Sequence, residues 1–200
     1  GPPGVGLLAC SNTGFKHLQA IICGNQFSKL RGGTENTPGI CALEKALQIT
    51  HRNRKTKNNH LKNMQQLFCK LLDTQPLFNT NQSRVFEQHK PVILKITPDC
   101  SSPNALMLSA VCMHADYNYI CGLKLKKQLY QQNIIIGTGS ACNSNTGSHV
   151  LAGMSLPEWV IKGSFRISML DNITARQVKQ VCRSIHKCIK QQIQEYQAKL

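Results

Sequence analysis

Long apolar runs are absent from this sequence, and their absence excludes a class of protein. No uninterrupted apolar run among the 200 residues approaches the roughly 18 residues that a membrane-spanning helix needs, so we predict no transmembrane segment. The first fifteen residues also lack a basic region ahead of an apolar stretch, which a secretion signal requires. Hydrophobic residues still make up 41% of the chain, so we expect one globular domain, alone or with a small appendage.

Regularly spaced cysteine pairs are absent as well. The ten cysteines are scattered, with no Cys-x-x-Cys pair and no framework of the kind that disulfide-stapled secreted domains have. We therefore expect a reducing compartment, the cytoplasm. Several cysteines lie on or next to apolar faces, where a cysteine packs as a small hydrophobic residue: Cys41, Cys69, Cys112, Cys121 and Cys188.

Acidic residues are scarce. Nine Asp and Glu stand against 24 Lys and Arg, which gives a net charge of +15 and raises the question of an anionic partner such as nucleic acid. The densest basic block is HRNRKTKNNHLK at 51–62. Aromatic residues are only 6% and no nucleic-acid recognition motif is present, so nucleic-acid binding stays an alternative. Salt-dependent retention on DNA that is lost on neutralising Arg52, Arg54, Lys55 and Lys57 would favour it.

Strand-like and helix-like segments alternate along the chain. Alternating or continuous apolar residues between turn signals predict strands at 5–10, 92–96, 105–112, 133–137 and 164–169. Apolar residues at helical spacing predict helices from Thr37, over 61–72, from Asp116 to Tyr130 with Ile120, Leu123 and Leu129 inward, and from Thr174. This order predicts a small α/β sandwich, and the chain before Thr37 need not belong to the same layer.

Cys142 differs from the other cysteines. It lies in the stretch GTGSACNSNTGSHVL at 137–151, directly after three isoleucines, and its neighbours are small and polar. Such a loop is exposed, and an exposed thiol can act as a nucleophile. Cys142 is therefore the candidate reactive residue.

Three further segments accompany the Cys142 loop at 139–151 in order along the chain: GPPGVG at 1–6, LRGGTENTPG at 30–39 and FRIS at 165–168. Together the four segments resemble those of the cysteine desulfurases, the NifS-like members of the class-V aminotransferases, which have pyridoxal-phosphate fold type I. Residues 139–151 resemble the loop that carries the catalytic cysteine of that family, and residues 1–6 the segment that follows its cofactor-bearing lysine. Residues 30–39 resemble the phosphate-contacting stretch, and residues 165–168 the strand whose arginine holds the substrate carboxylate. The resemblance covers essentially the whole chain.

The resemblance implies a fold and a division of the chain. The fold is the C-terminal part of a fold-type-I pyridoxal-phosphate transferase, with the end of the large domain followed by a small α/β sandwich. Residues 1–36 would end the large domain, 37–75 would form linking helices, and 76–200 would form the small domain that carries the Cys142 loop.

It also implies a reaction. Pyridoxal 5'-phosphate serves as electron sink while the sulfur of L-cysteine passes to Cys142 as a persulfide and alanine is released. Arg166 would bind the substrate carboxylate, and Thr34 would contact the phosphate of the other subunit's cofactor, which implies a homodimer. The persulfide would then go to a sulfur-acceptor protein or another partner protein.

Some positions depart from the family pattern. The family's cofactor lysine lies upstream of the Gly-Pro segment, so we expect this chain by itself not to anchor the cofactor. CGNQFSK at 23–29 replaces a glycine run, the loop from Cys142 to Ser148 is two residues shorter, and Leu170 and Asp171 replace glycine and arginine. These changes keep a second function open: a catalytically lapsed homologue that works as a protein-binding factor.

Two further groups of polar residues are interpreted as structural. His149 is expected to be a helix-start histidine exposed to water. Cys182, His186 and Cys188 include metal-ligating residue types, but Cys188 is turned away from Cys182 around the helix. We therefore predict no metal site.

Overall fold

The computed structural model describes residues 1–26, 29–77, 90–98, 101–114, 117–138 and 148–199. The chain folds as two compact units, Gly1–Lys55 and Thr56–Leu200, called unit 1 and unit 2 below. One helix, α2 (Thr37–Leu71), begins in unit 1 and ends in unit 2. Among the described residues, no helix combines the length and the apolar character needed to cross a bilayer.

Unit 2 is built on a mixed four-stranded sheet. Its strands are β1 (Thr74–Pro76), β2 (Val92–Lys95), β3 (Ala105–Val111) and β6 (Ser164–Ser168), in the spatial order β1-β2-β3-β6. β1 pairs with β2 in parallel, and the other two pairings are antiparallel. A two-stranded ribbon, β4 (Met113–His114) and β5 (Tyr117–Asn118), extends the end of β3.

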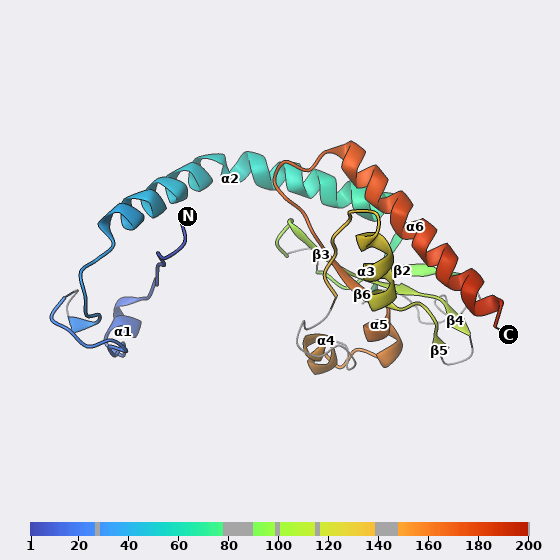
Figure 1. Cartoon of the computed structure of the whole chain (residues 1–200), viewed down its shortest axis with the longest axis horizontal. Helices are drawn as coiled ribbons and strands as arrows, with labels where there is room; N and C mark the ends of the chain where they lie inside the picture. The colour runs from blue at the N-terminus through green and yellow to red at the C-terminus, as the bar shows by residue number, and fades with distance from the viewer. Residues whose placement is uncertain (27–28, 78–89, 99–100, 115–116, 139–147, 200) are drawn as a thin grey trace. The chain divides into compact units, whose positions relative to one another are not determined.

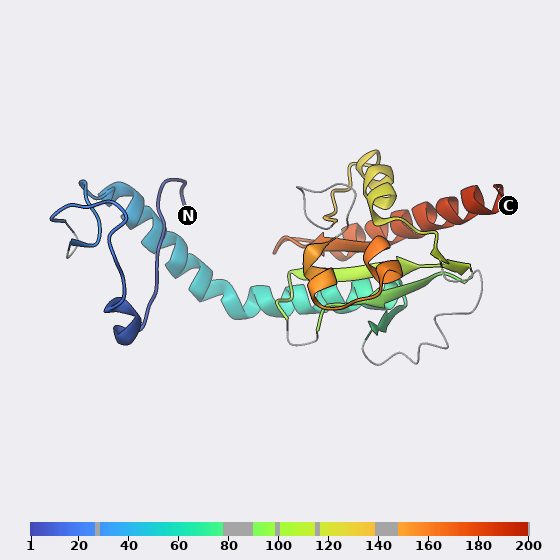
Figure 2. The same ribbon diagram turned by 90° about the horizontal axis from the view of Figure 1, so that it is seen from below.

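Helices cover both faces of this sheet (Figures 1 and 2). The last part of α2 lies on one face with α3 (Gly122–Tyr130) and α6 (Ala175–Gln197), and the short helices α4 (His149–Gly153) and α5 (Glu158–Lys162) lie on the other. The period-2 alternation of the strands produces the two faces, because Leu106 and Leu108 of β3 belong to the first core and Val111 to the second. This arrangement confirms the α/β class.

Two buried amides hold the ends of these elements. Asn118 accepts hydrogen bonds from the backbone of Cys112 and Ile120 and donates to the carbonyls of Ala110 and Trp159. Gln192 of α6 accepts from the backbone N–H of Cys121, the residue that precedes α3, at 2.9 Å. The side chain of Cys121 makes no capping bond itself, so α6 supplies the cap of α3.

The predicted strands at 92–96, 105–112 and 164–169 are confirmed within one or two residues. The terminal helix is confirmed as well, because Thr174 accepts from the backbone N–H of Gln177, whose side chain accepts in return from the backbone of Thr174. The buried face of α6 includes Val178, Ile185 and Ile189.

Two predicted strands are wrong. Residues 5–10 are irregular, and Leu7 and Leu8 are about three-quarters exposed. A strand needs a hydrogen-bonded neighbour, and none of the described residues of unit 1 provides one. At 133–137 only Gly137 makes a β-bridge, to Arg166.

The helical predictions need three corrections. The basic block does not separate two helices, because α2 runs through it: residues 40–71 contain neither proline nor glycine, and lysine and arginine are good helix formers. The helix expected from Asp116 begins at Gly122, and Asp116 itself lies outside the described residues. Leu125, rather than Leu123, faces inward with Leu129, and Leu123 is 42% exposed.

Unit 1 contains α1 (Asn12–Phe15), the glycine-containing stretch before α2, and the first part of α2. Asn36, one residue before the predicted cap, accepts from the backbone N–H of Gly39. Cys41, predicted to be a buried cysteine, is exposed on this part of α2. Of the other cysteines predicted to be buried, Cys112 and Cys188 are buried and Cys69 and Cys121 are half-buried.

Candidate functional site

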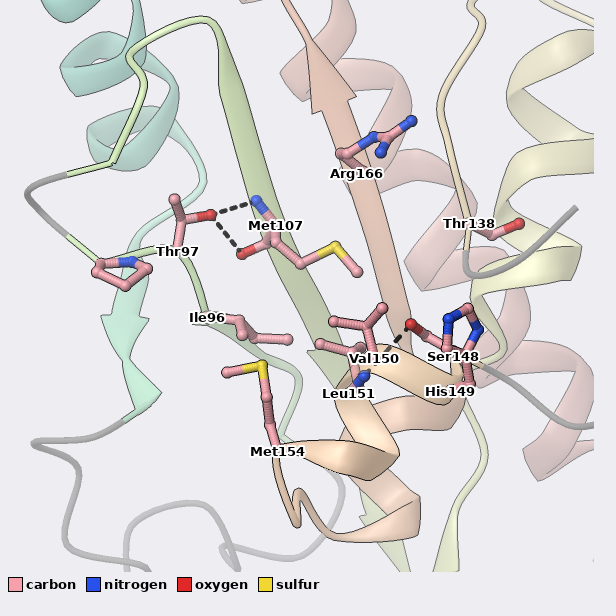
Figure 3. A pocket seen from close by; sticks show the side chains of 11 residues that line it. Ile96, Thr97, Met107, Thr138, Ser148, His149, Val150, Leu151, Met154 and Arg166 are labelled. Atoms are coloured by element: carbon pink, nitrogen blue, oxygen red, sulfur yellow. Dashed lines mark hydrogen bonds between the residues drawn. The ribbon is translucent and has the colours of Figure 1, made fainter. Parts of the chain in front are cut away.

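A pocket opens on the α4 side of the sheet in unit 2 (Figure 3). Its volume is about 460 Å³, within the range of small-molecule sites. Three parts of the chain supply its walls: the segment after β2, the neighbouring strands β3 and β6, and Thr138 together with α4. The lining residues are Ile96, Thr97, Pro98, Met107, Thr138, Ser148, His149, Val150, Leu151, Met154 and Arg166.

Arg166 owes its direction to strand alternation. Its neighbours Phe165 and Ile167 are buried under the helices of the opposite face, so the pleat turns the Arg166 side chain to the pocket side. Met107 of β3 lies directly opposite Arg166 in the sheet register, and it too lines the pocket. In Figure 3 the two side chains lie on adjacent strands, with the guanidinium at the end of the pocket away from α4.

The backbone of Arg166 lies between β3 and Gly137. On the β3 side it is the register partner of Met107, and on the other side its N–H donates to the carbonyl of Gly137 at 2.6 Å while its carbonyl accepts from the N–H of Gly137 at 2.8 Å. A Cβ atom at position 137 would lie 3.3 Å from Nε and 3.5 Å from Nη2 of Arg166. Glycine at 137 therefore leaves room for the guanidinium to lie against the backbone.

The guanidinium is the group of the pocket that is available for an anion. Thr97 hydrogen-bonds the backbone N–H and carbonyl of Met107, and Ser148 accepts from the N–H of Leu151 as the cap of α4. Within the described part of the chain, the Arg166 guanidinium makes neither an ion pair nor a hydrogen bond. A planar fork of N–H donors matches the two oxygens of a carboxylate.

His149 is exposed at the first position of α4, as predicted, and it also lines the pocket. Apolar side chains form most of the remaining wall. Val150 and Met154 of α4 are 57% and 46% exposed, and Ile96 and Leu151 are buried beneath them. The pocket thus combines one unpaired cation with an apolar wall, an arrangement suited to a small amphipathic acid.

Thr34 lies in unit 1 and is exposed. Gly24 and Gly32 pack so closely that a Cβ at Gly24 would lie 2.4 Å from Cα of Gly32, and Gly33 has a φ of 90°. Among the described residues, the backbone N–H groups of Gly33 and Thr34 have no hydrogen-bond acceptor, and neither has the Thr34 hydroxyl. This donor set fits a phosphate oxygen. Thr34 belongs to unit 1 and Arg166 to unit 2.

Cys142 lies outside the described residues. The structure does place the residues on either side of its segment, because Thr138 and Ser148 both line the pocket. The role of Cys142 therefore stays a prediction.

The cysteines of α6 are buried within the core, whereas His186 is exposed. Burial raises the pKa of the Cys182 thiol to about 12, and burial also raises the pKa of Cys188. Across the residues that the structure describes, no group of three His, Cys, Asp or Glu side chains could hold a metal ion.

Sequence reasoning missed Met107 and Thr97 as pocket residues. Met107 lines the site only because β3 pairs with β6 in one particular register, and the sequence does not reveal that register. Thr97 is placed by its bonds to Met107. The sequence could have indicated Thr138 as a pocket residue, since it belongs to the GTGSAC stretch that contains Cys142.

Comparisons with known proteins agree with this fold. Residues 1–181 match the family described as aminotransferase class-V. The chain is 30% identical over 191 residues to the cysteine desulfurase IscS of Methanosarcina thermophila, with 94% of this chain and 42% of the relative covered. It is 31% identical over 195 residues to the cysteine desulfurase IscS of Clostridium botulinum, with 96% of this chain and 44% of the relative covered.

Solved structures show the same likeness. A NifS-like protein superposes with a TM-score of 0.62 at 24% identity, over 86% of this chain and 39% of that chain. A NifS-like protein from Rickettsia africae superposes with a TM-score of 0.61 at 18% identity, over 86% of this chain and 40% of that chain. The chain thus spans less than half the length of the relatives it matches. Because the family match covers nine-tenths of its residues, the chain belongs to the class-V aminotransferases and is similar in sequence to cysteine desulfurases.

Proposed function

We propose that the protein containing this chain is a cysteine desulfurase that transfers sulfur from L-cysteine to Cys142. The observation that carries the proposal is the unpaired Arg166 guanidinium in a pocket that is otherwise mostly apolar. Arg166 binds the carboxylate of the substrate through its two-pronged donor set and orients the amino acid. The apolar wall of Met107, Leu151 and Met154 excludes water around the thiol end.

The sequence position of Cys142 supports it as the sulfur acceptor. Cys142 follows Thr138 by four positions and precedes Ser148 by six, and both of those residues line the pocket. In the proposed step the thiolate of Cys142 forms a bond to the substrate sulfur while the carbon–sulfur bond of cysteine breaks. The products are alanine and a persulfide on Cys142.

The family uses pyridoxal 5'-phosphate. When bound, this cofactor supplies the electron sink that makes the carbon–sulfur bond of the substrate breakable. In this chain the residues with donors for its phosphate are Gly33 and Thr34. In the proposed homodimer they would donate hydrogen bonds to the phosphate of the cofactor that the other subunit binds.

The test is sulfide release from L-cysteine, with added pyridoxal 5'-phosphate and a reductant, by the protein that contains this chain. The Cys142→Ala variant is compared with Cys10→Ala, which removes a cysteine that is exposed in unit 1. Turnover that is lost only in Cys142→Ala supports the proposal. If the protein binds the cofactor but releases no sulfide, the proposal is wrong. The alternative then replaces it: a homologue that has lost catalysis and works by binding a partner protein.

A further inference from the structure

Helix α6 carries a row of basic side chains along its whole length. Arg176, Lys179, Arg183, Lys187 and Lys190 follow one another at intervals of three or four residues, and all five are exposed. With 3.6 residues per turn, they fall within about a quarter of the helix circumference, and with a rise of 1.5 Å per residue they span about 21 Å. These five residues are called the basic stripe.

The basic stripe lies on the solvent side of unit 2. The opposite side of α6 is buried in the main core through Val178, Cys182 and Ile185. Figures 1 and 2 show α6 as an outer helix of this unit, beside α3. Within the part of the chain that the structure describes, no side chain of the stripe takes part in an ion pair or a hydrogen bond.

Acidic residues near the stripe are already paired. Glu195, the single acidic residue of α6, bonds to Lys124 of α3, and this contact lowers the pKa of its carboxyl. Asp171, shortly before α6, bonds to Lys57 of α2, with the same effect on its pKa. Both lysines lie outside the stripe, so the five stripe charges are not offset by the acidic residues closest to them in the chain.

The composition of the stripe argues for a phosphate backbone rather than a protein. None of the exposed large hydrophobic side chains among the described residues belongs to α6, and Tyr196 is stacked on Tyr119 with its ring centroid 4.3 Å away. Protein interfaces rely on apolar or aromatic anchors at their centre, and single-stranded nucleic acids are bound on aromatic platforms. The stripe has neither. Its side chains are cations, which contact the charged phosphates of a duplex.

The charge spacing fits the same partner. One strand of B-DNA carries a charge for every 3.4 Å of its axis, or about six charges over the roughly 21 Å of the stripe. Five evenly distributed cations match this density. An acidic protein segment has no such regular spacing imposed on it.

We propose that the basic stripe of α6 binds the phosphate backbone of a nucleic acid without sequence preference. This surface differs from the basic block at 51–62 to which the sequence drew attention. The proposal is independent of sulfur transfer, because the pocket of Arg166 lies on the other face of the sheet from α6.

The test is fluorescence anisotropy with labelled duplexes of about 20 base pairs and unrelated sequences, titrated with the full chain at about 50 to 200 mM salt. In the stripe variant Arg176, Lys179, Arg183, Lys187 and Lys190 are all replaced by glutamine. The matched control replaces five exposed lysines elsewhere in unit 2 by glutamine: Lys62, Lys70, Lys126, Lys127 and Lys199. Circular dichroism verifies that both variants stay folded.

We expect the wild type and the control to bind both duplexes with a slope of log affinity against log salt of about −4 to −5, as five phosphate contacts predict. The stripe variant should bind at least about 30-fold more weakly at the lowest salt, with a much shallower slope. The proposal is overturned if the stripe variant binds as the wild type does, or if the control loses as much affinity. It is also overturned if polyglutamate of equal charge competes as well as DNA, since the partner is then an acidic protein.

Discussion

At the scale of single residues, Arg166 shows how a backbone can aim a side chain. Two hydrogen bonds to Gly137 and the pairing of β6 with β3 fix the main chain around Arg166, and the pleat of β6 then directs the guanidinium into the pocket. Because the surrounding wall is largely apolar, the guanidinium has few competing partners. The residue is therefore prepared for an anion before the anion arrives, which lowers the ordering cost of binding.

The first prediction concerns this residue. Arg166→Lys keeps the charge but loses the planar fork, so we expect the KM for L-cysteine in the sulfide-release assay to rise about 10- to 100-fold, with a smaller effect on kcat. His149→Ala, in the same pocket and equally exposed to solvent, is the control and should leave KM nearly unchanged. An unchanged KM in Arg166→Lys would contradict carboxylate binding by Arg166.

The second prediction concerns the buried thiol of Cys182. Burial raises its pKa in the folded state from the ordinary 9.0 to about 12, so the folded chain keeps the thiol neutral over a range in which the unfolded chain ionises it. The stabilisation is complete below pH 9 and is lost as the pH rises from 9 towards 12. The free energy of unfolding of the wild type, measured with urea, should fall by up to about 1.4 kcal/mol more per pH unit in this window than that of Cys182→Ala. An equal dependence of the free energy of unfolding on pH in the two proteins would contradict the prediction.

At the scale of elements, junctions and caps decide where helices and strands begin. Gly163 joins α5 to β6 and lies against β3, and a Cβ there would be 2.0 Å from the carbonyl oxygen of Ala110. Thr174 and Gln177 close the start of α6, and Gln192 closes the start of α3. The elements that surround the pocket thus depend on a few contacts at their ends.

Gly163→Ala supplies the third prediction. The added methyl group forces β3 and β6 apart, so we expect a loss of about 1–3 kcal/mol in the free energy of unfolding, measured by urea denaturation. Gly153→Ala is the matched control, since a Cβ at Gly153 meets nothing within 4 Å. Comparable stability in both variants would show that the backbone at 163 adjusts freely.

The capping box of α6 supplies the fourth. Thr174→Ala removes an acceptor for the backbone N–H of Gln177, and the chain should lose about 1 kcal/mol of stability. Thr174→Ser retains the hydroxyl and should restore most of it. Thermal unfolding followed by circular dichroism measures both, and an alanine variant as stable as the serine variant would rule out a stabilising cap.

These elements also show how far sequence reasoning reaches. Periodicity and capping signals were enough for α6 and for β2, β3 and β6, because those segments bury one clear face. They failed at 133–137, where the apolar isoleucines predict a strand but only Gly137 has a pairing partner. The motif sufficed to single out Arg166, whereas Met107 depends on strand register, a property of the whole sheet.

At the scale of the whole molecule, the two units differ in how much they bury. Unit 2 contains both apolar cores, whereas in unit 1 the side chains of Ile21 and Ile22 are 98% and 59% exposed. Burial of apolar side chains is the main source of folding free energy. Unit 2 therefore supplies most of the stability of the chain.

The fifth prediction follows from this difference. The fragment 56–200 should fold alone and unfold cooperatively within about 5 °C of the full chain, because both cores lie within it. The fragment 1–55 should show no cooperative transition. Differential scanning calorimetry measures both, and a fragment 56–200 without a heat-absorption peak would mean that its cores need unit 1.

The pocket wall has a consequence for the order of folding. Arg166 pairs with Met107 and Gly137, both distant from it in the chain, and α4 reaches the site from a further segment. Such non-local strand pairings form late in folding, because the chain bears the entropy cost of closing the long loops between them before their contacts contribute any stability. A collapsed but unpaired chain therefore has no anion pocket. Ligand binding during refolding would report the final closure of the sheet rather than the initial collapse.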